Sequence, residues 1–281
     1  MKRDDLSVLT IGNSFTDSLT SYFAAVVESA GCRLHFERAN HGGCELHRHW
    51  KYIECEESDR VFRMYQNYTH TMKEILRSRA WDIVTIQQAS HASWRPETFE
   101  PYASNIIGYV REHAPSAEVC IQQTWAYRAD DPRIMPGGDW GIDQTAMYER
   151  LTENYRRLSE THGGLRIIPT GRAVQLARQR QPQAFKNYDP QLLKTLVWPD
   201  LPPQAWSLVG TCAWRKDSEG HLFIARDTIH LNERGKYLQA CVWFAFLYGR
   251  SASQEVTFVP DCLSDEDAAF LRGIADAACQ A

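Results

Sequence analysis

Short runs of apolar residues alternate along the chain with longer segments in which apolar residues recur every three or four positions. The short runs predict strands that are buried on both faces, and the longer segments predict amphipathic helices. The expected strands cover residues 7–11, 33–38, 83–87, 118–123 and 166–169. The expected helices cover residues 18–30, 60–79, 101–113 and 143–161. This alternation predicts an α/β fold, a three-layer sandwich with a central, mainly parallel, five-stranded sheet.

The pattern becomes irregular after Gly171. Five prolines lie between residues 181 and 203, so we expect an irregular excursion at the surface over about 181–220. A strand is expected at 221–224, and an amphipathic helix at 232–248 is ended by Gly249. Residues 264–267 have the pattern of a capping box that opens a last helix. No linker divides the chain, so we expect one domain over residues 1–281.

Composition and charge argue against two classes of binding partner, nucleic acids and membranes. The 281 residues carry a formal net charge of -4 with both signs interspersed, whereas a nucleic-acid surface would show a basic patch. No apolar run approaches the roughly 18 residues of a membrane span, and residues 8–11 are too short for a signal peptide core of about 7–15 residues. We therefore expect a cytoplasmic protein that binds neither nucleic acid nor membrane.

Two groups of residues invite a metal or disulfide interpretation. The eight cysteines are scattered without a CxxC spacing, which favours reduced and mostly buried thiols over disulfides or zinc ligands. His41, His47 and His49 form a dense group with Cys44 and Glu45, but their spacing matches no structural zinc pattern. We expect no metal site.

The first candidate for chemistry is Ser14, in the stretch Ile11-Gly12-Asn13-Ser14-Phe15. It follows the first expected strand, where a side chain lies at the carboxyl edge of a parallel sheet beside a helix N-terminus that favours negative charge. Gly12 permits the tight turn that this position needs. The position would equally suit a serine that only caps the helix, and the chain lacks the GxSxG motif of α/β-hydrolases.

The second candidate is the block Asp227-Thr-Ile-His230 near the other end of the chain. On a turn, this DxxH spacing lets the carboxylate fold back onto the imidazole and fix its tautomer, which leaves the other ring nitrogen for a serine. Such a pair alone often only caps a helix. Together with the Gly-Asn-Ser start it predicts a triad of Ser14 as nucleophile, His230 as general base and then acid, and Asp227 as orienting carboxylate.

These two motifs resemble those of the SGNH/GDSL hydrolase superfamily, whose members place a nucleophilic serine after the first strand and a DxxH block near the end. The chain is most similar to a bacterial subgroup with IGNSF, a third strand bearing Gln, a QTWAY segment and a DxxHLNxxGxYL ending. Here these motifs occupy residues 11–15, 82–90, 123–127 and 227–238. The resemblance implies the flavodoxin-like SGNH hydrolase fold and a serine esterase that works through an acyl-enzyme without a cofactor.

The resemblance also implies an oxyanion hole made by the backbone N–H of Ser14 and the N–H of a glycine after the second strand. The stretch Asn40-His-Gly-Gly-Cys44 falls at that place. Gly43 is slightly favoured over Gly42, and a glycine turn without a catalytic role remains an alternative at either position.

A side-chain amide after the third strand is the third implied donor. Most members supply an Asn in a Gly-x-Asn-Asp block, whereas this chain has Gln87-Gln88-Ala89-Ser90. The branch of sialate and carbohydrate acetylesterases similarly carries a Gln in a Gln-Gly-Glu-Ser stretch, and Gln87 with Ser90 fits that spacing. Gln88 is the alternative, because the next position along a strand faces the other way.

Several loop residues are candidates for substrate contacts. Trp125, Tyr127 and His41 follow expected strands at the edge where open α/β sheets bind ligands, and aromatic side chains there suit sugar rings. Such aromatic residues can also pack on one another, and for Trp94 and Trp140 the two interpretations are balanced. Asp130 and Asp131 are expected to be solvated loop charges.

By analogy with the branch that carries the Gln, the expected reaction removes an acetyl group from a carbohydrate. The partner is then a small-molecule or oligosaccharide ester. A lipase or thioesterase on the same scaffold is one alternative. A catalytically silent carbohydrate-binding protein is another, although the intact Ser14, Asp227 and His230 argue against it.

Overall fold

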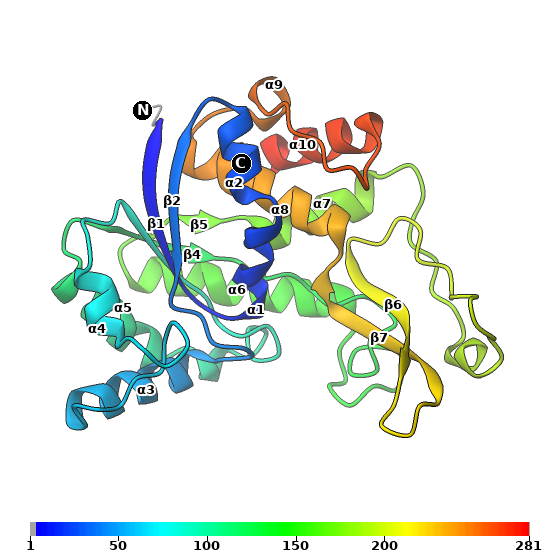
Figure 1. The fold of residues 1–281 in the computed structure, drawn as a ribbon, viewed down its shortest axis with the longest axis horizontal. Coiled ribbons are helices and arrows are strands. Elements are labelled where there is room, and N and C mark those ends of the chain that lie inside the picture. Colours follow the sequence, from blue (N-terminus) through cyan, green and yellow to red (C-terminus); the bar gives the residue numbers. More distant parts are fainter. Residues whose placement is uncertain (1–3, 281) are drawn as a thin grey trace.

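A parallel sheet of five strands forms the middle layer of the molecule (Figure 1). The computed structural model describes residues 4–280. The strands are β1 (Asp5–Ile11), β2 (Arg33–Arg38), β3 (Ile83–Ile86), β4 (Glu118–Gln122) and β5 (Ile167–Ile168). They lie in the order β2-β1-β3-β4-β5, and all four pairings are parallel. Strands β1, β3 and β4 are almost wholly buried, which is typical of a parallel sheet covered on both faces. The predicted α/β sandwich is confirmed.

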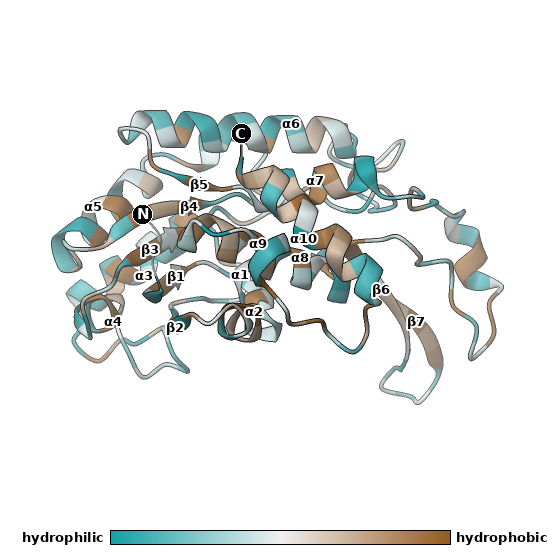
Figure 2. Cartoon of the chain, turned by 90° about the horizontal axis from the view of Figure 1, so that it is seen from above, coloured by the Kyte–Doolittle hydropathy of each residue, from teal (hydrophilic) through white to brown (hydrophobic). Residues whose placement is uncertain are grey.

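Helices cover both faces of the sheet (Figures 1 and 2). On one face lie α3 (Leu46–Ser58), α4 (Met72–Arg77) and α5 (Tyr102–His113). On the other lie α2 (Phe23–Ser29), α7 (Thr170–Arg180), α8 (Glu233–Tyr248) and α10 (Asp265–Cys279), with the short α9 (Ala252–Glu255) beside them. Helix α6 (Gln144–Thr161) runs along the β5 edge of the sheet and contacts α7. Helix α8 is buried on nearly every side, because the sheet lies on one side of it and α10 on the other.

The helix expected over residues 18–30 is broken into pieces. The chain forms a single turn, α1 (Ser14–Asp17), then a 3-10 turn, η1 (Ser18–Ser21), and only then α2. The Ser18 hydroxyl donates to the carbonyl of Phe15 at 2.8 Å, and the Thr20 hydroxyl donates to the carbonyl of Asp17 at 2.7 Å. Such side-chain bonds to the backbone compete with a regular helix.

The helix expected over residues 60–79 is wrong for most of its length. Only α4 falls within it, and Gln66, Asn67 and Tyr68 all have left-handed backbone angles, with φ of 48°, 59° and 63°. Three consecutive residues in that region cannot belong to a right-handed helix. Helix α3, which precedes this loop, was not predicted.

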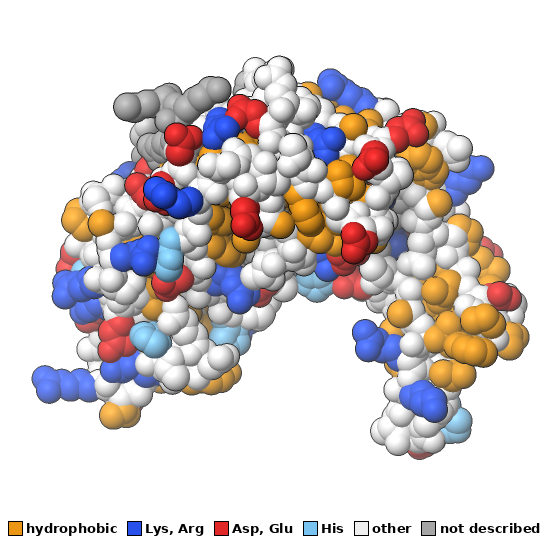
Figure 3. Space-filling model, turned by 45° about the horizontal axis from the view of Figure 1, so that its top comes forward, with side chains coloured by type: hydrophobic (Ala, Val, Ile, Leu, Met, Phe, Trp, Pro, Cys, Tyr) orange, Lys and Arg blue, Asp and Glu red, His pale blue; other side chains and the backbone are white. Residues whose placement is uncertain are grey.

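The excursion expected over residues 181–220 is irregular only in its first part, apart from the 3-10 turn η3 (Pro190–Lys194). Its end is a strand, β6 (Val209–Lys216), which pairs antiparallel with β7 (Leu222–Leu231). The strand expected at 221–224 is therefore much longer than predicted. The two strands form an arm that projects from the carboxyl edge of the sheet (Figure 1), and Figure 3 shows a hollow between this arm and the body.

Two further observations concern the cysteines and the apolar character of the helices. All eight cysteines are free thiols, and five of them are buried. Within residues 4–280, no helix combines the length and the apolar character that crossing a membrane requires.

Candidate active site

The three residues of the predicted triad lie in contact, although Ser14 and His230 come from opposite ends of the chain. The Ser14 hydroxyl oxygen is 2.9 Å from Nε2 of His230, and Nδ1 of His230 is 2.7 Å from Oδ2 of Asp227. Because a carboxylate only accepts, Nδ1 carries the ring proton and donates to Asp227. Nε2 is then left as the acceptor for the Ser14 hydroxyl. This is the chain of contacts that activates a serine as a nucleophile.

Ser14 is the first residue of α1, directly after the end of β1. Asn13 caps this helix, since its side-chain oxygen accepts from the N–H of Phe15 at 3.1 Å. The backbone of Asn13 is still extended, with φ of -149° and ψ of -159°, so the helix begins directly at Ser14. Ser14 therefore stands half-buried at the carboxyl edge of the sheet, as the sequence pattern predicted.

Asp227 and His230 belong to β7 and lie at the base of the arm. The pairing of β6 and β7 shifts its register at Gly210, so residues 228–230 bulge out of the ladder. Within this bulge, Oδ1 of Asp227 accepts from the N–H groups of Ile229 and His230 at 2.8 and 2.9 Å. The sequence placed the pair on a turn before a helix. The local geometry is indeed a turn, but a strand carries it.

The surroundings of Asp227 keep its carboxyl group ionised. Burial raises the pKa of Asp227, but the hydrogen bonds from the His230 ring and from the two backbone N–H groups outweigh it and hold the pKa well below its usual value. An ionised Asp227 stabilises the imidazolium that forms when His230 takes a proton from Ser14.

The glycine loop after β2 lies against the nucleophile. Nδ2 of Asn13 donates to the carbonyl of Cys44 at 3.0 Å, and the N–H of His41 donates to the carbonyl of Gly12 at 3.1 Å. Gly42 and Gly43 are exposed, and Gly43 has a left-handed φ of 61°, which glycine adopts without strain. Within residues 4–280, their N–H groups and that of Ser14 have no hydrogen-bond acceptor.

The two candidate glutamines lie in different places. The side chain of Gln88 is fully used by backbone groups: its oxygen accepts from Leu46 and Ala89, and its nitrogen donates to Thr98. Gln87 packs behind the nucleophile turn, where its Nε2 donates to Oδ1 of Asn13 at 2.7 Å. Gln87 is only 1% exposed, so it touches the nucleophile turn from inside the protein.

A comparison with protein families assigns the chain to one family. The family DUF4886, described as a domain of unknown function, matches residues 7–191. The chain belongs to the DUF4886 family. No curated protein matches it in sequence.

A solved structure shares the fold of this DUF4886 protein, and others have a lower similarity to it. A DUF4886 family protein from Bacteroides uniformis ATCC 8492 is 21% identical with a TM-score of 0.73, and the match covers 98% of this chain and 95% of that one. A candidate SGNH hydrolase from Slackia heliotrinireducens is 17% identical with a TM-score of 0.49, covering 84% and 95%. An acetyl xylan esterase is 13% identical with a TM-score of 0.46, covering 84% and 96%. At these identities the first likeness shows a common fold and no more.

Trp125 and Tyr127 are buried rather than presented to a ligand. Trp125 stacks on Phe15 with 4.1 Å between ring centroids, and its indole N–H donates to the carbonyl of Ile229 at 2.9 Å. The Tyr127 hydroxyl lies 2.9 Å from that of Ser90. Both aromatic side chains are at most 1% exposed, so this placement does not support the predicted sugar platforms. Trp125 instead braces both the nucleophile helix and the bulge that carries His230.

His49, which the sequence placed in the histidine group and to which it gave no role in catalysis, lies against the nucleophile turn. It lies on α3, fully buried, with Nε2 at 2.9 Å from the carbonyl of Gly12 and Nδ1 at 2.9 Å from the hydroxyl of Tyr65. Because a carbonyl only accepts, Nε2 carries the proton and Tyr65 donates to Nδ1. Burial lowers the pKa of His49 to about 4, so the ring is neutral at physiological pH and can hold this tautomer.

The other two histidines of the group, His41 and His47, take no part in the hydrogen bonds of His49. His41 is half-buried with its ring near Tyr52, and His47 is exposed. In the part of the chain that the structure describes, no group of three or more His, Cys, Asp or Glu side chains is arranged to hold a metal ion. His41 stays close to Ser14 through its backbone bond to Gly12, so it is still a candidate for a substrate contact.

The expectation of solvated charges at Asp130 and Asp131 is wrong, because both carboxylates are buried. Asp130 pairs with Arg128 at 2.6 Å, and Asp131 accepts from the hydroxyl of Thr228 at 2.6 Å. These contacts fix the loop after β4 to β7 next to Asp227. Charged residues in a loop can thus be structural when the loop itself is covered.

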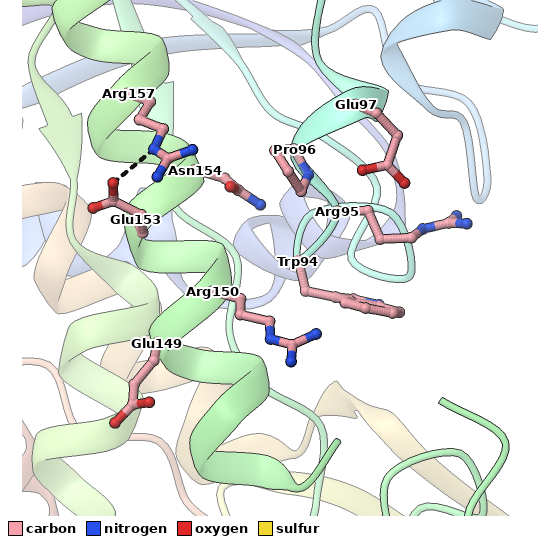
Figure 4. Close-up of a pocket in the computed structure, with 9 residues that line it drawn as sticks. All are labelled: Trp94, Arg95, Pro96, Glu97, Glu149, Arg150, Glu153, Asn154 and Arg157. Carbon is pink, nitrogen blue, oxygen red and sulfur yellow. Dashed lines mark hydrogen bonds and ion pairs between the residues drawn. The ribbon is translucent and has the colours of Figure 1, made fainter. Parts of the chain in front are cut away.

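A cavity of about 640 Å³ lies away from the triad, between α6 and the loop after β3 (Figure 4). The guanidinium groups of Arg95 and Arg150 lie 5.7 and 5.8 Å from the ring of Trp94, and Arg157 pairs with a glutamate of its own helix. Acidic and basic residues balance around it. None of its nine lining residues belongs to the triad or to the glycine loop.

Proposed function

We propose that this DUF4886 protein is a serine ester hydrolase of the SGNH/GDSL type. One observation carries the proposal: Asp227, His230 and Ser14 form an unbroken line of hydrogen-bonded contacts at the carboxyl edge of the sheet. Ser14 opens α1, and its own backbone N–H has no acceptor within residues 4–280, whereas the N–H groups of the next three residues are bonded to Asn13. The resemblance of the two sequence motifs to those of the superfamily supports the same assignment.

In the proposed first half-reaction, Nε2 of His230 takes the proton of the Ser14 hydroxyl as the oxygen attacks the ester carbonyl carbon. The resulting oxyanion accepts from the N–H groups of Ser14 and Gly43, which have no acceptor of their own within residues 4–280. When the tetrahedral intermediate collapses, His230 gives its proton to the departing alkoxide. An acyl group then remains on Ser14 and the alcohol leaves.

In the second half-reaction a water molecule replaces the alcohol. His230 takes a proton from this water as it attacks the acyl carbonyl, and then returns the proton to the Ser14 oxygen as the ester bond to the enzyme breaks. The products are a carboxylic acid and the restored hydroxyl. Asp227 stays ionised throughout and holds the ring of His230 in one tautomer.

The role that we propose for Gln87 differs from the direct oxyanion donor that the sequence predicted. Its nitrogen already donates to Asn13, and the side chain is buried behind the turn. We therefore assign Gln87 to positioning Asn13, and through it Ser14, ahead of direct contact with the oxyanion. Ser14 and Gly43 are the two proposed direct donors.

For the substrate we propose a short acyl group, with acetyl as the first choice, on a carbohydrate. Polar and backbone groups lie next to Ser14: His230 is at 2.9 Å, and the loop that carries His41 and the Gly42–Gly43 turn is bonded to Gly12 and Asn13. This lining favours a small acyl group and a hydroxylated leaving group over a long apolar chain. The hollow beside the arm (Figure 3) leaves room for an extended leaving group.

A panel of p-nitrophenyl esters from acetate to palmitate, together with acetylated oligosaccharides, tests the proposal. We expect the highest kcat/KM for acetate and a loss of at least about a thousandfold in Ser14→Ala. Ser21→Ala is the matched control, because Ser21 is exposed in the same segment. A preference for long chains would point to a lipase or thioesterase. No turnover on any ester, combined with binding of oligosaccharides, would point to a binding protein.

A further inference from the structure

A second cavity, of about 250 Å³, lies against the loop that follows β4. That loop, the start of α6, the helix α7 and the segment 181–208 enclose it. Its lining includes Arg128, Gln144, Arg178, Phe185 and Asn187. Pockets for drug-sized ligands usually measure about 300–1,000 Å³, so this one suits only a small molecule or ion.

Arg128 lines this cavity with a buried charge, and one of its donors has no partner among the described residues. The residue is 2% exposed, and its Nε and Nη2 donate to the two carboxylate oxygens of Asp130 at 2.6 and 3.0 Å. The remaining nitrogen, Nη1, is buried without a hydrogen-bond partner within residues 4–280. Phe185 covers the guanidinium with its ring centroid at 5.0 Å. A buried donor that makes no bond is destabilising, and native proteins usually satisfy it with an acceptor.

Arg178 brings a second guanidinium without a carboxylate partner among the described residues. Its Nη2 donates to the backbone carbonyls of Ala126 and Tyr127 at 2.9 and 3.3 Å, which are neutral groups. Burial lowers the pKa of Arg178 to about 9, with no anionic group to offset the desolvation. The charge of Arg178 therefore has no counter-ion here.

The balance of charge around the cavity is positive. Asp130 is the carboxylate that faces Arg128, and it is shared with Arg226 at 3.5 Å. One acidic group thus meets Arg128 and Arg226, and Arg178 adds a further positive charge. A surplus of positive charge of this kind, in which Arg128 is buried and Arg178 and Arg226 are half-buried, favours an anion, and the planar fork of arginine matches two oxygens of a phosphate, sulfate or carboxylate.

We propose that this cavity binds one small oxyanion, with Arg128 and Arg178 as its principal ligands. The shared chemistry is that of a compact group with several acceptor oxygens, whether inorganic phosphate, sulfate or the carboxylate of a small organic acid. The site is separate from the proposed oxyanion hole and takes no part in ester cleavage.

The place of this site in the fold gives it a structural effect. The N–H of Arg128 donates to the carbonyl of Thr228 at 2.9 Å, so the cavity wall is bonded to the strand that carries Asp227. A bound anion would tie the β4 loop, α7 and the irregular segment 181–208 together. Binding to the native state alone raises stability in proportion to the logarithm of ligand concentration.

The test measures thermal unfolding and calorimetric binding on the full chain, with sodium phosphate, sodium sulfate and sodium acetate compared at constant ionic strength against sodium chloride. We expect a saturable rise of the Tm with at least one oxyanion and none with chloride. The anion that binds most tightly distinguishes an inorganic from an organic ligand. No saturable shift with any of the three would overturn the proposal.

Variants locate the binding. Arg178→Gln should weaken binding at least about tenfold, whereas Arg180→Gln, an exposed arginine of the same helix, should leave it unchanged. Asn187→Asp covers the case in which Arg178→Gln does not fold, since it adds a carboxylate at an exposed lining position and should also weaken binding. Unchanged affinity in the folded variants would refute the assignment. Ser14→Ala should bind like the wild type, so failure of the esterase proposal leaves this test intact.

Discussion

The two halves of the proposed active site are held in different ways. On the nucleophile side, Ser14 follows a turn whose neighbours are buried and bonded to one another: Gly12 to His49, and Asn13 to Gln87. On the base side, the side chains of His230 and Asp227 are 39% and 35% exposed and sit on a projecting arm. The nucleophile is thus positioned by contacts with the buried core of the protein, whereas the base is positioned by hydrogen bonds within one bulge of β7.

The largest effect on activity is expected from a substitution of Asp227, because this residue holds the exposed base His230 in place. Asp227→Asn keeps the shape of the bulge but presents a neutral amide to Nδ1 of His230, so the ring can adopt the wrong tautomer. We expect kcat to fall by about 10⁴-fold on precedent for this change in a serine triad. Steady-state kinetics on the best ester of the panel measures it.

The matched control is Asp217→Asn, because Asp217 also accepts backbone N–H bonds in a turn of the same arm. Its kinetics should equal those of the wild type. Equal activity of Asp227→Asn and the wild type would instead remove Asp227 from the mechanism.

A smaller effect is expected from the core support of the nucleophile. His49→Ala removes the N–H that holds the carbonyl of Gly12, so Ser14 should shift slightly from its position for attack. We expect kcat to fall by about tenfold to a hundredfold while KM stays nearly constant, because misplacement of a reacting group acts on the chemical step. Pre-steady-state acylation with a p-nitrophenyl ester measures that step directly.

Two variants separate positioning from simple loss of stability. His49→Gln can retain a donor toward Gly12 and should recover part of the activity, whereas His47→Ala, an exposed neighbour on α3, should behave as the wild type. If His49→Gln and His49→Ala lost activity and Tm to the same extent, the role of His49 would be structural only.

The same comparison explains which parts of the site could be predicted from the sequence. Ser14, Asp227 and His230 belong to short motifs whose spacing encodes their contacts, so the prediction brought them together correctly. His49 belongs to α3, which escaped prediction. The buried positions of α3 are Leu46, His49, Ile53 and Glu56, with helical spacing but with two ionisable residues among four. A search for apolar residues at helical spacing misses a buried face on which half of the residues are polar.

The errors elsewhere have related causes. The loop at residues 66–68 needs left-handed backbone angles at three non-glycine residues, for which the sequence offers no signal. Asp130 and Asp131 looked solvated because their partners Arg128 and Arg133 lie within the same covered loop. The sheet itself was predicted almost to the residue, and for β1, β3 and β4 the reason is that strands buried on both faces are rich in apolar residues.

A change at the contact between the two halves should have a modest effect. Trp125 stacks on Phe15 on the nucleophile side and donates to Ile229 on the base side. Trp125→Phe keeps most of the stacking but deletes the indole N–H, a bond worth about 0.5–1.5 kcal/mol. We expect kcat to fall by at most about tenfold. A fall as large as that of Asp227→Asn would show that Trp125 does more than join the halves.

The smallest effect on activity is expected from Glu56, which belongs to the buried face of α3 but lies away from Ser14. Burial raises the pKa of Glu56 to about 7, above its unfolded value near 4.5. A raised folded pKa means that the stabilising contribution is complete below about pH 4.5 and is lost as the pH rises through about 7. Glu56→Gln should therefore be more stable than the wild type at pH 8, and the difference should shrink toward pH 4.5.

Urea unfolding at several pH values measures this difference, and kcat should not change. His49 contributes a slope of opposite sign, since its lowered pKa costs stability as the pH falls from about 6.5 toward 4, but it is present in both proteins and cancels in the comparison. Glu54→Gln, an exposed glutamate of the same helix, should show no such pH dependence. A pH-independent difference for Glu56→Gln would mean that Glu56 is not protonated on folding, and the nucleophile side would then bury a charge as well as neutral hydrogen bonds.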